Sequence, residues 1–144
     1  MDLILWRHAD AEEGAPDLER KLTAKGRKQA EQVAAWLLER LDDFEIMASP
    51  AVRAQQTATA LGKKITTVKQ LAPGASVSAI LKAAGWPDGE RTVIVVGHQP
   101  DLGCAIAYLL SGEDTEWRLK KGALWWFSND GQPIVRAVVS PDLL

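Results

Sequence analysis

The most constraining feature of this sequence is one apolar run in its second half. Residues 91–96 (RTVIVV) are mostly β-branched and apolar, which is typical of a strand that is buried on both faces of a sheet. Helices cover both faces of such sheets. A chain of 144 residues, 47% of them hydrophobic, can bury a core of this kind without a disulfide or a structural metal. We therefore expect a single domain that spans residues 1–144.

Apolar runs that predict strands alternate with segments that predict helices. The strands are expected at residues 2–8, 44–48, 65–71 and 91–96, followed by a pair at 122–128 and 134–139 around a turn. The helices are expected from Thr23 to about Asp42, from Ser49-Pro50 onward, and at 76–84 and 101–110, with Thr23 and Ser49 as N-caps. This alternation predicts an α/β fold, a three-layer α/β/α sandwich with a mostly parallel central sheet.

The charge and the amino terminus exclude several classes of protein. The net charge is −2 and the basic residues are scattered, which argues against a nucleic-acid partner. The first residues carry no basic segment or cleavage site, and no apolar run approaches the length of a membrane span. We therefore expect a cytoplasmic protein with no nucleic acid or membrane partner. Cys104 is the only cysteine, so it cannot form an internal disulfide.

The two histidines of the chain both follow predicted strands. His8 follows the first strand with Arg7 beside it, and His98 follows the strand at 91–96. Arg53 lies near the start of the helix that follows the second strand. Because the carboxyl ends of parallel strands border one crevice, we expect these four residues to form one site. The alternative interpretation is that both are ordinary surface or core histidines.

Two arginines and two histidines in one crevice indicate a ligand that carries phosphate. The forked donors of a guanidinium bind two oxygens at once and never lose their charge. A neutral imidazole nitrogen can attack phosphorus and form a phosphoenzyme that water then hydrolyses. The second histidine can stabilise charge on the transferred group, and the helix start at Ser49-Pro50 adds backbone N–H donors.

Four segments in order resemble the signatures of a known family. They are LWRHA at 5–9, LTAKGRKQA at 22–30, SPAVRAQQTA at 49–58 and VGHQP at 96–100. Together they are similar to the successive motifs of the histidine phosphatase superfamily. The short chain without a large insertion resembles its SixA-type phosphohistidine phosphatases. The resemblance covers residues 2 to 140.

This resemblance implies a phosphoglycerate mutase-like fold and a phosphatase that forms a covalent phosphohistidine intermediate. His8 would be the nucleophile, Arg7 and Arg53 would bind the phosphoryl oxygens, and His98 would complete the pocket. It implies no metal and no cofactor. The expected partner is a phosphohistidine-bearing protein or a small phosphorylated substrate.

The sequence departs from the family pattern at two places. Ala9 stands where the wider superfamily usually has glycine after the histidine. Many larger members carry a glutamate soon after the third strand, where residues 71–75 here read LAPGA and hold no carboxylate. The proton donor is therefore open, and each candidate could instead be a solvated or helix-capping carboxylate. The candidates are Asp10, Glu12, Asp17 and Asp101.

The missing glutamate favours a substrate whose leaving group is easily protonated, such as phosphohistidine. The alternatives are a small-molecule phosphomonoesterase or nucleotide pyrophosphohydrolase that uses the same pocket, and a non-catalytic phosphate-binding module. Lys120 and Lys121 are interpreted as a solvated pair, with contact to an acidic partner as the alternative.

Overall fold

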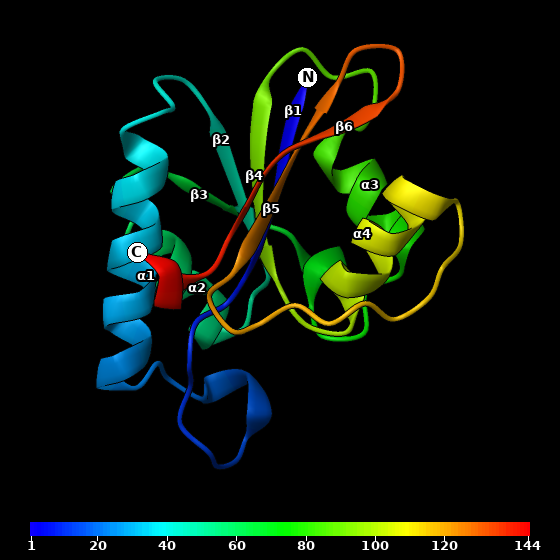
Figure 1. Ribbon diagram of the computed structural model, residues 1–144. Helices are drawn as coiled ribbons and strands as arrows, with labels where there is room; N and C mark the ends of the chain where they lie inside the picture. Colours follow the sequence, from blue (N-terminus) through cyan, green and yellow to red (C-terminus); the bar gives the residue numbers. More distant parts are fainter.

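The computed structural model describes residues 1–144 and contains one six-stranded sheet with helices on both faces (Figure 1). The strands are β1 (Asp2–Arg7), β2 (Glu45–Ala48), β3 (Ile65–Thr67), β4 (Thr92–Gly97), β5 (Leu124–Asn129) and β6 (Pro133–Val139). The helices are α1 (Ala24–Leu38), α2 (Val52–Thr59), α3 (Val77–Ala84) and α4 (Asp101–Ser111), with 3-10 turns η1 (Asp17–Glu19), η2 (Lys69–Leu71) and η3 (Pro141–Leu143). No helix is both long enough and apolar enough to cross a membrane.

The sheet is mostly parallel, as predicted. Its order is β3-β2-β4-β1-β5-β6. Strands β3, β2, β4 and β1 are parallel, and β5 pairs antiparallel with both β1 and β6. Strand β4 lies between β2 and β1, and Val93 to Gly97 are buried. That position explains why its sequence is a nearly continuous apolar run. The carboxyl ends of β1, β4 and β2 lie next to one another at one edge of the sheet.

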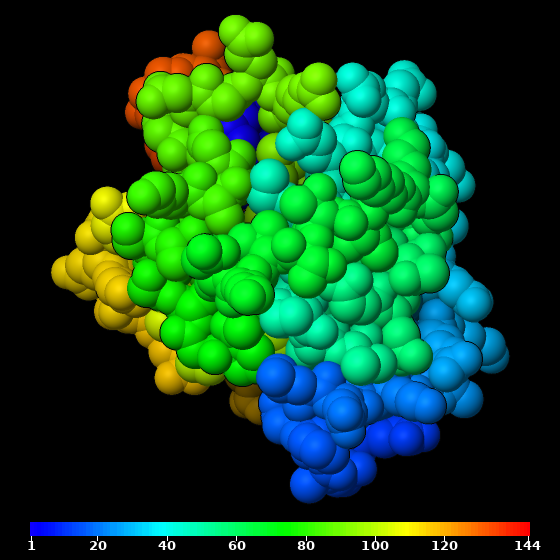
Figure 2. Space-filling model, turned by 180° about the vertical axis from the view of Figure 1, so that it is seen from behind, coloured from blue at the N-terminus to red at the C-terminus, as the bar shows by residue number.

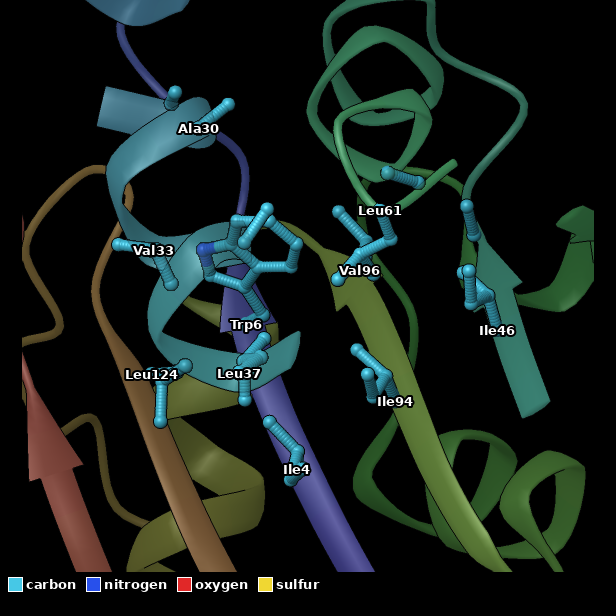
Figure 3. Close-up of a cluster of buried hydrophobic side chains, with 14 of the residues drawn as sticks. Ile4, Trp6, Ala30, Val33, Leu37, Ile46, Leu61, Ile94, Val96 and Leu124 are labelled. Carbon is cyan, nitrogen blue, oxygen red and sulfur yellow. The ribbon is translucent and has the colours of Figure 1, made fainter. Parts of the chain in front are cut away.

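Successive residues of β1 point to opposite faces and enter two separate cores. Ile4 and Trp6 pack with residues of α1 and α2 on one face (Figure 3). Leu3 and Leu5 pack with residues of α3 and α4 on the other face. The predicted three-layer α/β/α sandwich is therefore confirmed.

The loop between β1 and α1 projects beyond the carboxyl edge of the sheet (blue in Figure 2). Its start is packed tightly against α1. A Cβ atom at Gly26 would overlap the backbone carbonyl of Asp10, so only glycine allows this approach. The Asp10 carbonyl also accepts the N–H of Thr23 at 3.0 Å. The loop that follows His8 is thus anchored at both of its ends.

One predicted cap is confirmed and one is wrong. The Thr23 hydroxyl accepts the N–H of Gly26 at 2.9 Å and caps α1. Helix α2 instead begins at Val52 after Ala51, and no side chain caps it. The Ser49 hydroxyl accepts the N–H of Ala51 at 3.1 Å. This bond closes a turn before the helix begins, which leaves Ser49 outside the helix.

Two predicted elements end about four residues earlier in the structure. Strand β3 ends at Thr67 instead of residue 71 because its only neighbour, β2, ends at Ala48, which is paired with Thr67. The next residues form the turn η2. Helix α1 ends at Leu38 instead of near Asp42, since its last turn tightens where the Arg40 N–H donates to the carbonyl of Leu37.

Candidate active site

The structure brings the four predicted site residues together at the carboxyl edge of the sheet. Arg7 ends β1 opposite Gly97 of β4, and the N–H of His8 donates to the Gly97 carbonyl at 3.0 Å. His8 and His98 therefore leave neighbouring strands side by side, with ring centroids 5.3 Å apart. Arg53 comes from the first turn of α2. Residues that are far apart in the chain meet because β1 and β4 are adjacent in the sheet.

The ring of His8 is oriented by its own backbone neighbour. Its Nδ1 lies 2.7 Å from the carbonyl oxygen of Ala9, which can only accept, so Nδ1 carries the proton. Nε2 then holds a lone pair that no other group of the protein engages, and His8 lines the pocket. Burial lowers the pKa of His8 to about 4, and the charges of Arg53 and Arg7 contribute in the same direction. At neutral pH this ring is a neutral base with one free nitrogen.

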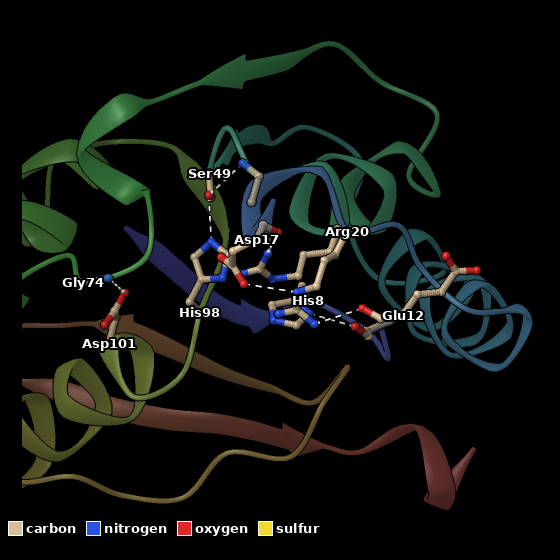
Figure 4. A network of polar contacts seen from close by, with 11 residues as sticks. His8, Glu12, Asp17, Arg20, Ser49, Gly74, His98 and Asp101 are labelled. Atoms are coloured by element: carbon tan, nitrogen blue, oxygen red, sulfur yellow. Dashed lines mark hydrogen bonds and ion pairs between the residues drawn. The ribbon is translucent and has the colours of Figure 1, made fainter. Parts of the chain in front are cut away.

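The ring of His98 is oriented by Ser49 (Figure 4). Its Nε2 lies 2.7 Å from the Ser49 hydroxyl oxygen, which already accepts the N–H of Ala51. Burial lowers the pKa of His98 to about 3, with further lowering from His8 and Arg53, so the ring is neutral.

The hydrogen-bond network assigns the proton of this neutral ring. The Ser49 hydroxyl proton has no other acceptor, so it donates to Nε2 of His98 and the ring proton resides on Nδ1. Nδ1 is buried and has no hydrogen-bond partner. His98 therefore presents an unused N–H donor beside His8.

The arginines are held by backbone carbonyls and by one carboxylate. Arg7 donates to the carbonyl of Leu119 at 2.7 Å. Arg53, only 4% exposed, donates to the carbonyl of Asp17 at 2.8 Å and to its carboxylate at 3.1 Å. Arg20 donates to the same carboxylate at 3.1 Å. The Nε groups of Arg7 and Arg53 are buried without a partner, so both guanidinium groups retain unused donors.

These residues line one open pocket of about 410 Å³, which we call the reaction pocket. Beyond the four predicted residues, its lining consists of Ala11, Glu13, Gly14, Asp17, Arg20, Pro73, Gln99 and Lys121. Only one of the twelve lining residues is hydrophobic, so the pocket suits an anionic group better than an apolar one. The sequence reasoning missed Arg20 and Glu13 as site residues, although both lie in the polar loop directly after His8.

Two of the four candidate proton donors are held as anions. The hydroxyl of Thr23 and then the ammonium of Lys121 lower the pKa of Asp10. Desolvation raises the pKa of Asp17, but its bonds with Arg53 and Arg20 outweigh that effect and lower it. Neither carboxyl group is suited to donate a proton near neutral pH.

The other two candidates lie outside the reaction pocket. Burial raises the pKa of Asp101, but its carboxylate accepts the N–H groups of Gly74 and Ala75 at 2.9 and 3.0 Å (Figure 4). Asp101 thus anchors the loop after β3 that brings Pro73 to the pocket. Glu12 does not line the pocket either, and its backbone carbonyl accepts a bond from Arg20.

Comparison with known proteins identifies the family. Residues 3–74 match the sequence profile of the histidine phosphatase superfamily, branch 1. The chain is also 32% identical over 124 residues to the phosphohistidine phosphatase SixA of Escherichia coli, an alignment that covers 78% of this chain and 76% of that protein. The chain belongs to the histidine phosphatase superfamily.

Two further comparisons extend this result. An uncharacterized protein of Picosynechococcus is 39% identical over 116 residues, which cover 72% of this chain and 69% of that protein. The structure of the protein histidine phosphatase SixA complexed with tungstate superposes with a TM-score of 0.86 at 26% identity, over 99% of both chains. The fold is therefore that of SixA-type histidine phosphatases. The reaction pocket is accordingly interpreted as the site of a phosphatase reaction.

Proposed function

We propose that this histidine phosphatase hydrolyses phosphohistidine on a protein, with His8 as the nucleophile. The observation that carries the proposal is the bond between Nδ1 of His8 and the carbonyl of Ala9. It leaves Nε2 as the free nitrogen of a neutral ring, in a residue that lines the same pocket as Arg7 and Arg53. A neutral imidazole nitrogen in a pocket with two guanidinium groups is suited to attack a phosphoryl group.

In the first step, Nε2 of His8 attacks phosphorus and the P–N bond of the substrate breaks. The departing imidazole takes up a proton from solvent, and the phosphoryl group stays on Nε2 of His8. In the second step, water attacks phosphorus, the bond between phosphorus and Nε2 breaks, and inorganic phosphate leaves with neutral His8 restored. The attacking water releases one proton to solvent, which balances the proton taken up in the first step. Arg7, Arg53 and the Nδ1–H of His98 bind the equatorial oxygens, where negative charge accumulates.

The surroundings of the reaction pocket favour an easily protonated leaving group. Asp17 in the pocket and Asp10 beside it have lowered pKa values and are poor proton donors. The imidazole of phosphohistidine can be protonated near neutral pH before it leaves, whereas an alkoxide needs an acid. The pocket lining contains one carboxylate besides Asp17, that of Glu13. The relationship to SixA of Escherichia coli supports the same substrate class.

We also propose that the enzyme needs no metal ion. Two arginines and the Nδ1–H of His98 can stabilise the negative charge of the phosphoryl oxygens, which is the role that a metal ion would otherwise have. No three metal-binding side chains of the chain lie close enough to hold one together.

The test compares kcat/KM for a phosphohistidine protein, a set of alkyl and aryl phosphate esters, and a nucleotide panel, with and without EDTA. We expect the phosphohistidine protein to be hydrolysed fastest, alkyl esters slowest, and EDTA to have no effect. Quenched reactions should contain a phosphoryl group on His8, located by mass spectrometry. A large preference for a sugar phosphate or nucleotide would assign the enzyme to small-molecule phosphoryl hydrolysis instead.

A further inference from the structure

A second concave surface adjoins the reaction pocket and is strongly basic. This groove, of about 630 Å³, shares Arg7 and Lys121 with the reaction pocket. It lies between the first turns of α1, the extended segment before β5 and the chain end near η3. Its cations, which define what we call the basic groove, are Arg7, Lys25, Lys28, Arg118, Lys120 and Lys121.

The charge of the basic groove opposes that of the whole protein. Its six cations face two carboxylates, Asp10 and Asp142, which leaves a local charge of +4 in a chain of net charge −2. Lys121 pairs with Asp10 at 3.0 Å, and Lys120 pairs with Asp142 at 3.5 Å. Lys25, Lys28 and Arg118 are exposed and form no ion pair. These three charges are available to a partner.

The placement of the lysines on α1 does not serve the stability of the helix. The amino terminus of a helix is the positive end of its dipole and favours acidic side chains. The first turn of α1 contains no acidic residue, and Lys25 and Lys28 lie there and at the start of the next turn. Lysines at the positive end of a helix dipole cost stability. Their position beside the reaction pocket therefore indicates that they serve binding.

The lining of the groove indicates the chemistry of its ligand. Leu119, which is buried, is its only hydrophobic residue, and no aromatic ring is available to stack on a base. Exposed lysines are flexible, strongly hydrated point charges. Such a surface suits the carboxylates of a protein partner, which it attracts over a distance and orients on encounter.

We propose that the basic groove docks an acidic surface of the protein that carries the phosphohistidine. This proposal rests on the proposed function, and it adds the chemistry of the partner. The groove and the pocket are mechanically joined, because Arg7 binds the carbonyl of Leu119 in the groove wall. A phosphorylated side chain in the reaction pocket would therefore place the flanking surface of its protein against the lysines.

The test uses the double variant Lys25→Glu/Lys28→Glu and two substrates. One is a histidine-phosphorylated acidic phosphotransfer domain, and the other is free phosphohistidine. At low salt we expect kcat/KM for the protein substrate to fall by about tenfold or more, and the loss to shrink as salt screens the charges. Turnover of free phosphohistidine should change less than twofold. The thermal midpoint should stay the same or rise, because glutamate suits the start of α1.

The matched control is Lys64→Glu/Lys82→Glu, which reverses two exposed lysines that line neither the pocket nor the groove. It should leave both substrates unaffected. Equal losses of kcat/KM in the two double variants would show that the change in net charge alone causes the effect. That result would overturn the docking proposal. An unchanged protein substrate in Lys25→Glu/Lys28→Glu would overturn it too.

Two other outcomes separate the proposals. If the parent enzyme hydrolyses no phosphohistidine protein, the proposed function fails and the docking proposal fails with it. In the second outcome, the parent binds single-stranded DNA at physiological salt, and Lys25→Glu/Lys28→Glu loses that binding while its kinetics on the protein substrate are unchanged. The groove would then be a nucleic-acid site, and the acidic-protein proposal would be wrong.

Discussion

The reaction pocket and the basic groove are both cationic and share Arg7 and Lys121, but most of their charges are held in different ways. In the pocket, the side chain of Arg53 is 5% exposed and is held by bonds to Asp17. In the groove, the side chains of Lys120 and Lys121 are 72% and 48% exposed. Buried and oriented charges stabilise a defined geometry, whereas exposed charges attract a partner from a distance. Substitutions in the two regions should therefore differ in kind.

The largest effect is expected at the nucleophile. His8→Asn removes the nitrogen that attacks phosphorus, so turnover should fall by about four orders of magnitude or more. No phosphoenzyme should accumulate in quenched reactions, and the circular dichroism spectrum should match that of the parent. Trapping the phosphoryl group on His98 in the parent enzyme would reverse the roles assigned to the two histidines.

The next effect compares the same substitution in the two regions. Arg53→Lys keeps the charge but loses the forked donor, so kcat/KM should fall by about one to two orders of magnitude. Arg118→Lys in the groove should change kcat/KM less than twofold for free phosphohistidine and for the protein substrate. The measurement is steady-state kinetics on both substrates. Equal losses in both variants would show that geometry matters as much in the groove as in the pocket.

A smaller effect is expected at Ser49, which positions His98. Ser49→Ala removes the donor to Nε2, so the ring loses its fixed tautomer and kcat should fall by about tenfold, or about 1.4 kcal/mol. Nitrogen NMR of the imidazole should place the proton on Nδ1 in the parent. In the variant it should show a mixture of the two neutral tautomers. Ser49→Thr keeps the hydroxyl and should restore the parent tautomer. A parent enzyme with the proton on Nε2 would contradict the assignment.

The buried histidines also predict how stability depends on pH. Their pKa values fall from 6.5 to about 4 for His8 and about 3 for His98 on folding. Between these limits the unfolded chain binds more protons, so the free energy of unfolding decreases as the pH drops below 6.5. The slope approaches about 1.4 kcal/mol per pH unit for each histidine.

Denaturant titrations between pH 7.5 and about pH 5 measure this slope in a range where most carboxylates stay ionised. His98→Asn should make it shallower. Arg118→Gln in the groove should leave it unchanged, because no buried neutral group is removed. A parent slope near zero would mean that the histidines bind protons as readily in the folded protein as in the unfolded chain.

The smallest effect is expected at Asp17, whose side chain is 58% exposed. Its carboxylate occupies donors of Arg53 that a phosphoryl group would use. Asp17→Asn should therefore tighten tungstate binding by about two- to fivefold, which is the scale of an exposed ion pair. Isothermal titration measures this affinity. A steep loss of kcat for alkyl esters in the same variant would identify Asp17 as the proton donor after all.

Local sequence was enough to predict the architecture and that four residues, Arg7, His8, Arg53 and His98, would meet in one pocket. The apolar run of β4 and the alternation of strands with helices predicted the layered α/β fold. The spacing of hydrophobic residues along a short segment is enough to distinguish a strand from a helix and to show which side is buried. His8, Arg53 and His98 could be predicted to meet because each follows a strand, and parallel strands end at the same edge. Thr23 could be predicted as a cap because its partner is three residues away.

Contacts between distant segments decided the rest. Ser49 looked like a helix cap in sequence, yet its hydroxyl binds His98, 49 residues away. Asp17 and Asp101 were two of four open candidates for the proton donor, but one is paired with two arginines and the other anchors a loop. The protonation of a carboxyl group or an imidazole depends on burial and on nearby charges, which no local pattern contains. Lys120 and Lys121 stood out in the sequence as a basic pair, but the groove as a whole could not be predicted. Lys25 and Lys28 lie about 90 residues earlier in the chain, and only the packing of α1 beside the segment before β5 brings the four lysines together.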